Sequence, residues 1–473
     1  MRVAVLSAEA VPYSKTGGLG DVAGALPKAL RAVGEDAFLI TPCYWQTRGE
    51  YLWHTAVHDL DVEWRGGRYP AKAFYSEANG SPTFLIDAPS YFHRDSIYGY
   101  VEDYERFAFF NHAALALIKR LGAPPDIVHL NDWHCGFAAV ELAHLRFWDS
   151  YWRDTRTVFS IHNLAYQGGF DLGELWKFGF SSDFERNAFA FNGYASAMKA
   201  GLAVSDMLST VSRTYGYEMQ TPANGYGLDW LLRERSDRLY GIVNGVDFDI
   251  WNPETDRELG AHYNALDLSG KRECKRQLLE QFSLPVDLDR PIFANITRLT
   301  AQKGIDLMMA VAGDILATGA YIVSLGSGER QYENFWQKLR DYAPRQVGVF
   351  RGYNESLAHR IEAGADVFMM PSKFEPCGLN QMYSLRYGTI PVVRAVGGLD
   401  DTVENFDAVS GTGNGFKFRE YSPDKFLEKI YEALFAYYDK DAWRKLQWNG
   451  MTIDNSWENA ARKYVELYRR TVS

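Results

Sequence analysis

The chain has 473 residues, 47% of them hydrophobic and 23% charged, a composition typical of a globular protein and a length that predicts two or three domains. Its 60 acidic and 50 basic residues leave a net charge of −10, which argues against nucleic acid as a partner. No apolar run approaches the roughly 20 residues that span a bilayer, and the N-terminus has no signal-peptide pattern, so we expect a cytoplasmic protein without a membrane partner. The four cysteines show no C-x-x-C pair, so we expect neither a structural metal nor a disulfide framework.

Short apolar runs alternate with amphipathic stretches throughout the chain. In the first half the predicted strands are residues 3–6, 38–40, 84–86, 127–130, 158–161, 208–211 and 239–243, and helices are predicted over 107–121 and 138–147. In the second half the predicted strands are 292–296, 321–325, 347–350, 367–370 and 390–393, and the predicted helices are 304–317, 331–339, 356–363 and 379–387. This βαβα alternation predicts an α/β protein of two doubly wound domains with parallel sheets, in which ligands bind beyond the carboxyl ends of the strands.

The boundary between the two domains is expected at the Asn-Gly turn of residues 244–245, which the W-N-P run at 251–253 follows. The last segment has the spacing of a helix with Trp457, Ala460, Tyr464 and Leu467 on one face. We therefore expect a first domain over 1–245, a second over 246–455 and a C-terminal helix over 456–473.

The most informative motif, K-T-G-G-L-G-D-V at residues 15–22, lies between the first predicted strand and an amphipathic helix. Its glycines let backbone N–H groups approach a ligand closely, the helix N-terminus attracts anions, and Lys15 adds a positive charge. The spacing is neither that of a G-x-G-x-x-G dinucleotide fingerprint nor that of a Walker A loop. Alone, the run would indicate only a tight strand–helix connection.

Two further polar motifs follow predicted strands in the first half. H-L-N-D-W-H at 129–134 contains Asp132, whose carboxylate can bind sugar hydroxyls or stabilise a positive transition state; for a lone Asp, a helix N-cap is the simpler role. S-I-H-N-L-A-Y-Q-G at 160–168 places His162 and Asn163 together at the predicted ligand edge. A lone histidine after a strand more often has a structural role, but the two polar side chains together favour a ligand-binding role.

Two motifs follow strands in the second half. Arg298 and Lys303 precede the predicted helix at 304, where both side chains and the helix dipole can bind one anion; two basic loop residues more often lie on a solvated surface. F-E-P-C-G-L-N-Q at 374–381 contains Glu375 and Cys377. A cysteine nucleophile has no support, because the sequence shows no paired histidine.

Taken together, these motifs resemble the signatures K-T-G-G-L-x-D-V, H-x-H/N-D-W-H, T-I-H-N-x-x-Y/F-Q-G, S-R-L-T-x-Q-K-G and F-E-P-C-G-L-T-Q of bacterial glycogen synthases and plant starch synthases. They occur in the same order at similar intervals, and the resemblance extends from residue 3 to 457. It implies two Rossmann-like domains that face each other across a deep cleft (the GT-B fold). The first domain would bind the glucan acceptor, the second the nucleotide-sugar donor, and the C-terminal helix would cross back to the first.

The resemblance further implies an enzyme, a retaining hexosyltransferase that moves glucose from ADP-glucose to the nonreducing 4-hydroxyl of glycogen or another α-1,4-glucan, with no metal and no cofactor. The implied catalytic residues are Asp132, His162, Arg298, Lys303 and Glu375. The implied donor-binding residues are Lys15, Gly17, Gly18, Asn244, Tyr353, Cys377, Gly378, Leu379 and Asn380, and the implied acceptor-binding residues are Asp21, Tyr98, Asn163 and Tyr166. The sequence departs from the family at Ala200, Asn380 and Asp400, where Gly, Thr and Ala are usual.

Other classes of protein stay open. A UDP-glucose-using synthase remains possible because no residue can be shown to read the base, and so does a glucan-binding protein without catalysis. D-F-D at 247–249 has the form of a metal-binding Asp-x-Asp; since it follows the linker turn, we interpret it as structural. A nicotinamide dehydrogenase would show the same alternation of strands and helices, but the absence of a G-x-G-x-x-G motif argues against this class.

Overall fold

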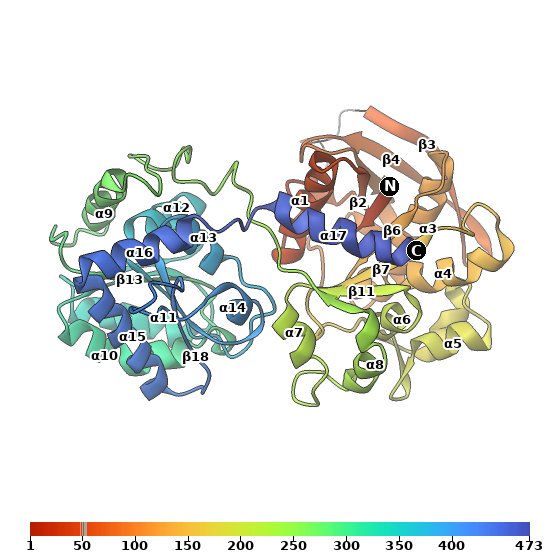
Figure 1. The fold of residues 1–473 in the computed structure, drawn as a ribbon. Coiled ribbons are helices and arrows are strands. Elements are labelled where there is room, and N and C mark those ends of the chain that lie inside the picture. Colours follow the sequence, from red (N-terminus) through yellow and green to blue (C-terminus); the bar gives the residue numbers. More distant parts are fainter. Residues whose placement is uncertain (48, 50, 52–53) are drawn as a thin grey trace. The chain divides into compact units, whose positions relative to one another are not determined.

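The computed structural model describes residues 1–47, 49, 51 and 54–473, and the chain divides into two compact units (Figure 1). The first unit comprises Met1–Gly245 and Trp457–Ser473, and the second comprises Val246–Ser456. The sequence placed these boundaries after 245 and after 455. Where the chain leaves and re-enters the first unit, a Cβ added at Gly245 would lie 2.4 Å from the Cα of Trp457, and Val246 forms a parallel bridge with Ser456.

A nine-stranded sheet forms the centre of the first unit, in the order β12-β11-β7-β6-β1-β2-β5-β4-β3. Pairing is parallel from β12 to β5 and antiparallel between β5, β4 and β3. The strands are β1 (Arg2–Leu6), β2 (Asp36–Pro42), β3 (His54–Trp64), β4 (Gly67–Ser76), β5 (Thr83–Asp87), β6 (Ile127–Asn131), β7 (Arg156–Ile161), β11 (Met207–Thr210) and β12 (Leu239–Gly241). A small antiparallel sheet consists of β8 (Gly169–Phe170), β10 (Tyr194–Ser196) and β9 (Ala190–Phe191).

The helices of the first unit include one from the end of the chain. They are α1 (Gly18–Ala32), α2 (Pro89–Phe92), α3 (Asp103–Arg120), α4 (Gly136–Trp148), α5 (Asp183–Phe189), α6 (Ala197–Val204), α7 (Arg213–Glu218), α8 (Asp229–Glu234) and α17 (Trp457–Val472), with 3-10 turns at Trp45–Thr47, Trp133–Cys135, Leu172–Phe178 and Ser236–Arg238. Helix α17 lies against α1 (blue on red in Figure 1) and shares its apolar core. The hydroxyl of Tyr468 on α17 lies 2.7 Å from Nδ1 of His129 on β6.

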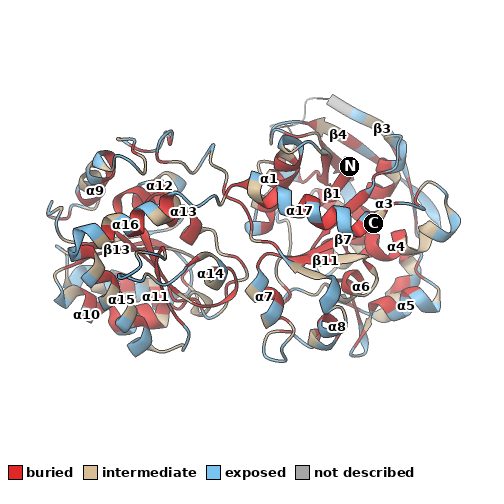
Figure 2. Ribbon diagram, in the orientation of Figure 1, coloured by how far each residue is buried: buried red, intermediate tan, exposed pale blue. Residues whose placement is uncertain are grey.

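The second unit is built on a six-stranded, wholly parallel sheet in the order β15-β14-β13-β16-β17-β18. The strands are β13 (Ile292–Ile296), β14 (Tyr321–Gly326), β15 (Val347–Arg351), β16 (Val367–Met370), β17 (Ile390–Arg394) and β18 (Phe416–Phe418). The helices are α9 (Ser269–Gln281), α10 (Ile305–Ala317), α11 (Arg330–Tyr342), α12 (Glu355–Gly364), α13 (Asn380–Arg386), α14 (Gly397–Thr402), α15 (Pro423–Tyr438) and α16 (Lys440–Met451), with a 3-10 turn at Ala301–Lys303. An apolar core covers each face of the sheet. Figure 2 shows the strands of this sheet mostly buried.

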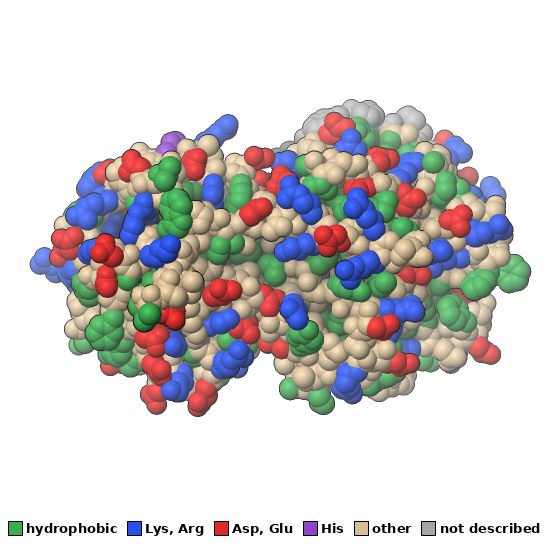
Figure 3. Space-filling view, viewed as in Figure 1, with side chains coloured by type: hydrophobic (Ala, Val, Ile, Leu, Met, Phe, Trp, Pro, Cys, Tyr) green, Lys and Arg blue, Asp and Glu red, His purple; other side chains and the backbone are tan. Residues whose placement is uncertain are grey.

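The predicted α/β architecture with two parallel sheets is confirmed, and each predicted strand and helix is found within a few residues of its expected bounds. The sequence missed β3 and β4, because residues 67–70 at the start of β4 are all exposed and the apolar alternation there is weak. It also missed α15 and α16. In the described part of the chain, no helix combines the length and the apolar character that crossing a membrane requires. Acidic and basic side chains are mixed over the face seen in Figure 3.

Candidate active site

The glycine-rich loop joins β1 to α1, with Gly17 as the helix N-cap and Gly18 as the first helical residue. A Cβ added at either glycine would meet nothing within 4 Å among the described residues, and the φ of Gly17, −156°, is ordinary extended backbone. Neither packing nor backbone conformation therefore demands glycine here, which is consistent with a ligand approaching the loop closely. The ammonium group of Lys15 forms an ion pair with Asp21, 2.7 Å from its Oδ1, at the partly exposed start of α1.

Glu9 holds this loop, although the sequence analysis did not single it out. It is 3% exposed, and its carboxylate accepts hydrogen bonds from the backbone N–H groups of Thr16 and Gly17 and from the hydroxyls of Thr16 and Tyr98. Burial raises the pKa of Glu9, while these hydrogen bonds lower it. One carboxylate thus connects the predicted donor loop to Tyr98, a predicted acceptor residue.

Asp132 follows β6 in a strained backbone conformation, with φ 57° and ψ −179°, which costs an L-residue about 1–3 kcal/mol. Its Oδ1 accepts hydrogen bonds from the backbone N–H groups of His162, at 2.8 Å, and Asn163, at 3.4 Å, both beyond the end of β7. The simpler role that the sequence suggested, side-chain capping of the following turn, is wrong, because among the described residues no such capping bond forms at Trp133–Cys135. The carboxylate instead connects the carboxyl ends of two neighbouring strands.

Burial determines the protonation states of Asp132 and His162. Burial, opposed by the two backbone hydrogen bonds and aided by the nearby Glu9 carboxylate, raises the pKa of Asp132 from 3.8 to about 7. Burial also lowers the pKa of His162 to about 4, and its Nε2 lies 2.9 Å from Oδ1 of Asn131. At neutral pH the site therefore presents a neutral imidazole beside a carboxyl group that is close to its midpoint of titration. A buried carboxylate of this kind can stabilise a developing positive charge strongly.

The predicted acceptor residues differ in their surroundings. The ring of Tyr98 stacks on His134, with centroids 4.9 Å apart, and is locked in place by its bond to Glu9. The side chain of Asn163 accepts the N–H of Ala165, and Tyr166 is 63% exposed. Asn244, predicted to bind the donor, is buried, and its Oδ1 has no hydrogen-bond partner among the described residues.

In the second unit, Lys303 and Glu375 lie together beyond the ends of β13 and β16. The Lys303 ammonium contacts Oε2 of Glu375, which also accepts the hydroxyl of Ser372 at 3.2 Å. The two loops are joined by a bond from the side-chain amide of Gln302 to the carbonyl of residue 374 at 3.1 Å, while Arg298 is exposed. A cation next to a carboxylate suits a ligand with phosphates at one end and hydroxyls at the other.

The turn before α13 presents backbone donors. Gly378 has φ +71°, and a Cβ there would lie 2.5 Å from Oε1 of Gln381, so this position requires glycine. In the described structure the N–H groups of Gly378 and Leu379 meet no acceptor. The side chain of Asn380 donates to the carbonyl of Ile296 on β13, at 2.8 Å, so its amide is engaged in the protein. Cys377 is 7% exposed.

Two further features of the second unit are Tyr353 and the D-F-D run at 247–249. Tyr353, 74% exposed, donates its hydroxyl to Glu355 at 3.1 Å. Oδ1 of Asp247 accepts the N–H of Asp249 at 2.9 Å, as a local turn does, and within the described ranges no three His, Cys, Asp or Glu residues are grouped to hold a metal.

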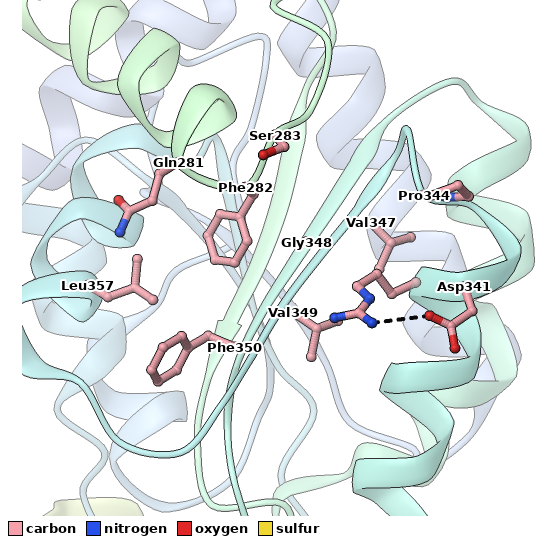
Figure 4. Close-up of a pocket in the computed structure, with 11 residues that line it drawn as sticks. Gln281, Phe282, Ser283, Asp341, Pro344, Val347, Gly348, Val349, Phe350 and Leu357 are labelled. Carbon is pink, nitrogen blue, oxygen red and sulfur yellow. Dashed lines mark hydrogen bonds and ion pairs between the residues drawn. The ribbon is translucent and has the colours of Figure 1, made fainter.

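A pocket of about 620 Å³ borders the edge strand β15 (Figure 4). Phe282, Phe350 and Leu357 lie on one side of it and Asp341 lies on the other. Asp341 forms an ion pair with Arg340, which also lines the pocket. None of the predicted site residues lines it.

Comparisons with known proteins assign both halves of the chain to families. Residues 2–234 match the family model described as the starch synthase catalytic domain, and residues 277–445 match glycosyl transferases group 1. The protein is therefore a glycosyltransferase composed of two α/β units.

Full-length relatives define the family. The chain is 46% identical to a glycogen synthase of Anaeromyxobacter sp. and 42% identical to one of Clostridium beijerinckii, in each case over 99% of both chains. The solved catalytic domain of starch synthase IV from Arabidopsis thaliana, bound to ADP and acarbose, is 35% identical with a TM-score of 0.90, over 100% of this chain and 99% of that one. The chain belongs to the glycogen and starch synthase family. Sucrose-phosphate synthase from Thermosynechococcus elongatus, 18% identical with a TM-score of 0.59 over 99% of this chain and 98% of that one, shares the fold alone.

Proposed function

We propose that this enzyme transfers glucose from ADP-glucose to the nonreducing 4-hydroxyl of glycogen or another α-1,4-glucan, with retention of configuration, in the cytoplasm and without metal or cofactor. The observation that carries the proposal is the contact of Lys303 with Glu375 at the carboxyl ends of β13 and β16. That is where a doubly wound sheet binds its ligand. The relative solved with ADP and acarbose supports ADP as the leaving nucleotide.

In this proposal, Lys303 and Arg298 neutralise the diphosphate as the glycosidic bond breaks, and Lys15 adds a third positive charge. The backbone N–H groups of Gly378 and Leu379, which meet no acceptor among the described residues, bind phosphate oxygens. Glu375 binds hydroxyls of the donor glucose. A retaining transfer then takes place on one face of the sugar, and the leaving phosphate accepts the proton of the attacking 4-hydroxyl.

Asp132 and His162 act on the donor glucose in the same proposal. The buried Asp132 carboxylate stabilises the oxocarbenium-like centre. The hydrogen bond that it accepts from the His162 N–H fixes the positions of the two residues relative to each other. Because burial lowers the pKa of His162 to about 4, its ring is neutral at pH 7 and acts as a hydrogen-bonding group. No covalent nucleophile is required.

The test compares ADP-glucose with UDP-glucose as donors to glycogen, with EDTA present, by following incorporated glucose. Elongation that depends on ADP-glucose supports donor, reaction and metal independence together. Elongation with UDP-glucose alone would overturn the donor, and glycogen binding without transfer from either donor would overturn the catalytic role. Retention is checked by the anomeric configuration of the new linkage.

A further inference from the structure

Tyr226 combines two features that folding does not explain. Its φ is 49°, in the left-handed region that a bulky residue rarely adopts, and its side chain is 47% exposed. It has a glycine on each side, Gly225 and Gly227, and Gly227 is itself left-handed with φ 82°. Glycine or asparagine would take this conformation at lower cost, so an exposed aromatic ring at this position has a reason other than stability.

The backbone of Tyr226 is anchored to the predicted acceptor loop. Its carbonyl oxygen accepts a hydrogen bond from the side-chain amide of Gln167 at 3.0 Å, and Gln167 follows Tyr166 in the loop beyond β7. The same loop is also held by Tyr215, whose hydroxyl accepts the N–H of Leu164 at 3.1 Å. Tyr226 therefore belongs to the frame that positions this loop.

The loop that Tyr226 anchors begins at residues bonded to Asp132, whose Oδ1 accepts the N–H groups of His162 and Asn163. Burial raises the pKa of the Tyr215 hydroxyl, and both the Asp132 carboxylate and the Tyr226 hydroxyl raise it further. The Tyr226 hydroxyl and the Asp132 carboxylate thus lie within electrostatic reach of one group. Tyr166, which precedes Gln167 in the same loop, presents a second exposed ring.

An exposed tyrosine offers an apolar face and a hydroxyl without charge, which suits the C–H face of an uncharged sugar ring. We propose that Tyr226 binds a glucosyl unit of the α-glucan acceptor, beyond the unit that reacts, and so sets the affinity for long chains. The inference rests on the proposed function, because it takes the acceptor to be a glucan. It adds a residue and a subsite to the acceptor side, outside the motifs that predicted that side.

The test uses Tyr226→Asn, which tolerates left-handed backbone and removes the ring, Tyr226→Trp, which keeps an aromatic face, and Tyr342→Ala as a control that removes an 84% exposed ring from the second unit. For Tyr226→Asn we expect Tm to rise by about 2–4 °C. We expect its KM for glycogen to rise by about 3- to 10-fold. The KM values for maltose and ADP-glucose should stay within about 2-fold of wild type, and Tyr226→Trp and Tyr342→Ala should keep the wild-type KM for glycogen.

Migration in gels that contain glycogen, without donor, gives a second readout that is independent of turnover. Weaker retardation of Tyr226→Asn alone supports the subsite, even if the wild-type protein uses another donor or none, so failure of the proposed reaction remains distinguishable. Unchanged retardation and unchanged KM for glycogen in Tyr226→Asn would overturn the proposal. A rise in the KM for ADP-glucose instead would overturn it as well, by placing the ring at the donor.

Discussion

Replacing Asp132 by Asn should stabilise the protein at pH 8 while it removes activity. The rise of the Asp132 pKa from 3.8 to about 7 corresponds to about 4 kcal/mol. The folded state therefore holds a proton that the unfolded chain has already released between pH 4 and pH 7. Over that window the contribution of Asp132 to stability falls as the pH rises, and above pH 7 the full cost of the buried charge is present. Asn carries no charge at any pH, and its side-chain oxygen can still accept the N–H of His162.

We therefore expect Asp132→Asn and wild type to have similar stability at pH 4. As the pH rises, the variant should become progressively more stable than wild type, by up to about 4 kcal/mol above pH 7. This difference raises the Tm of the first unit by about 8–16 °C. Scanning calorimetry at pH 5, 6, 7 and 8 measures this difference, and hydrogen exchange in β6 assigns the transition to the first unit. Activity should fall because the proposed charge stabilisation is lost. A variant that is no more stable than wild type at pH 8, or whose gain is the same at pH 5 and pH 8, would refute the account of a buried charge.

Three further predictions follow from single contacts. Lys303→Ala should lower kcat/KM by about 30- to 1,000-fold, or about 2–4 kcal/mol of transition-state stabilisation, and turnover close to wild type would exclude Lys303 from a catalytic role. Gly17→Ala should raise the KM for ADP-glucose and leave Tm unchanged. Gly24→Ala, whose Cβ would lie 2.4 Å from a backbone oxygen, should instead lower Tm. Equal losses of Tm in the two variants would contradict the proposal that Gly17 is glycine because a ligand approaches it. Tyr468→Phe should destabilise the first unit by about 1–3 kcal/mol, because it removes the hydrogen bond to the buried ring of His129. Urea unfolding at pH 7 measures this change. A smaller loss of stability than in an exposed control such as Tyr438→Phe would contradict the prediction.

Much of the architecture could be predicted because buried parallel strands leave short apolar runs in the sequence. The strands at 127–130 and 292–296 are such runs, and their carboxyl ends also locate Asp132 and Lys303. The edge hairpin of β3 and β4 leaves no such signal, since residues 67–70 face solvent. Element prediction thus succeeded for the buried parallel strands and failed for the exposed hairpin of β3 and β4 and for the helices α15 and α16.

Site residues could be predicted from the sequence where they lie in motifs. They could not be predicted where long-range contacts in the folded chain determine their role. Glu9 carries no motif, and its partnership with Tyr98 joins positions 89 residues apart. The strained backbone of Asp132 and the bond from Asn380 to Ile296 are likewise consequences of tertiary packing. Residue type identifies which groups can react, whereas the protonation of Asp132 depends on a burial that only the folded chain defines.

The return of α17 to the first unit has a consequence for synthesis. The second unit, Val246–Ser456, is inserted between two segments of the first, and Tyr464 and Tyr468 of α17 are fully buried there. A ribosome completes the second unit before it releases the helix that finishes the first, so the half of the protein that begins the chain is the last to close its core. A nascent chain arrested before residue 457 would carry a complete second unit beside an exposed apolar surface on the first. The core of the first unit is therefore complete only after Trp457–Ser473 has been synthesised.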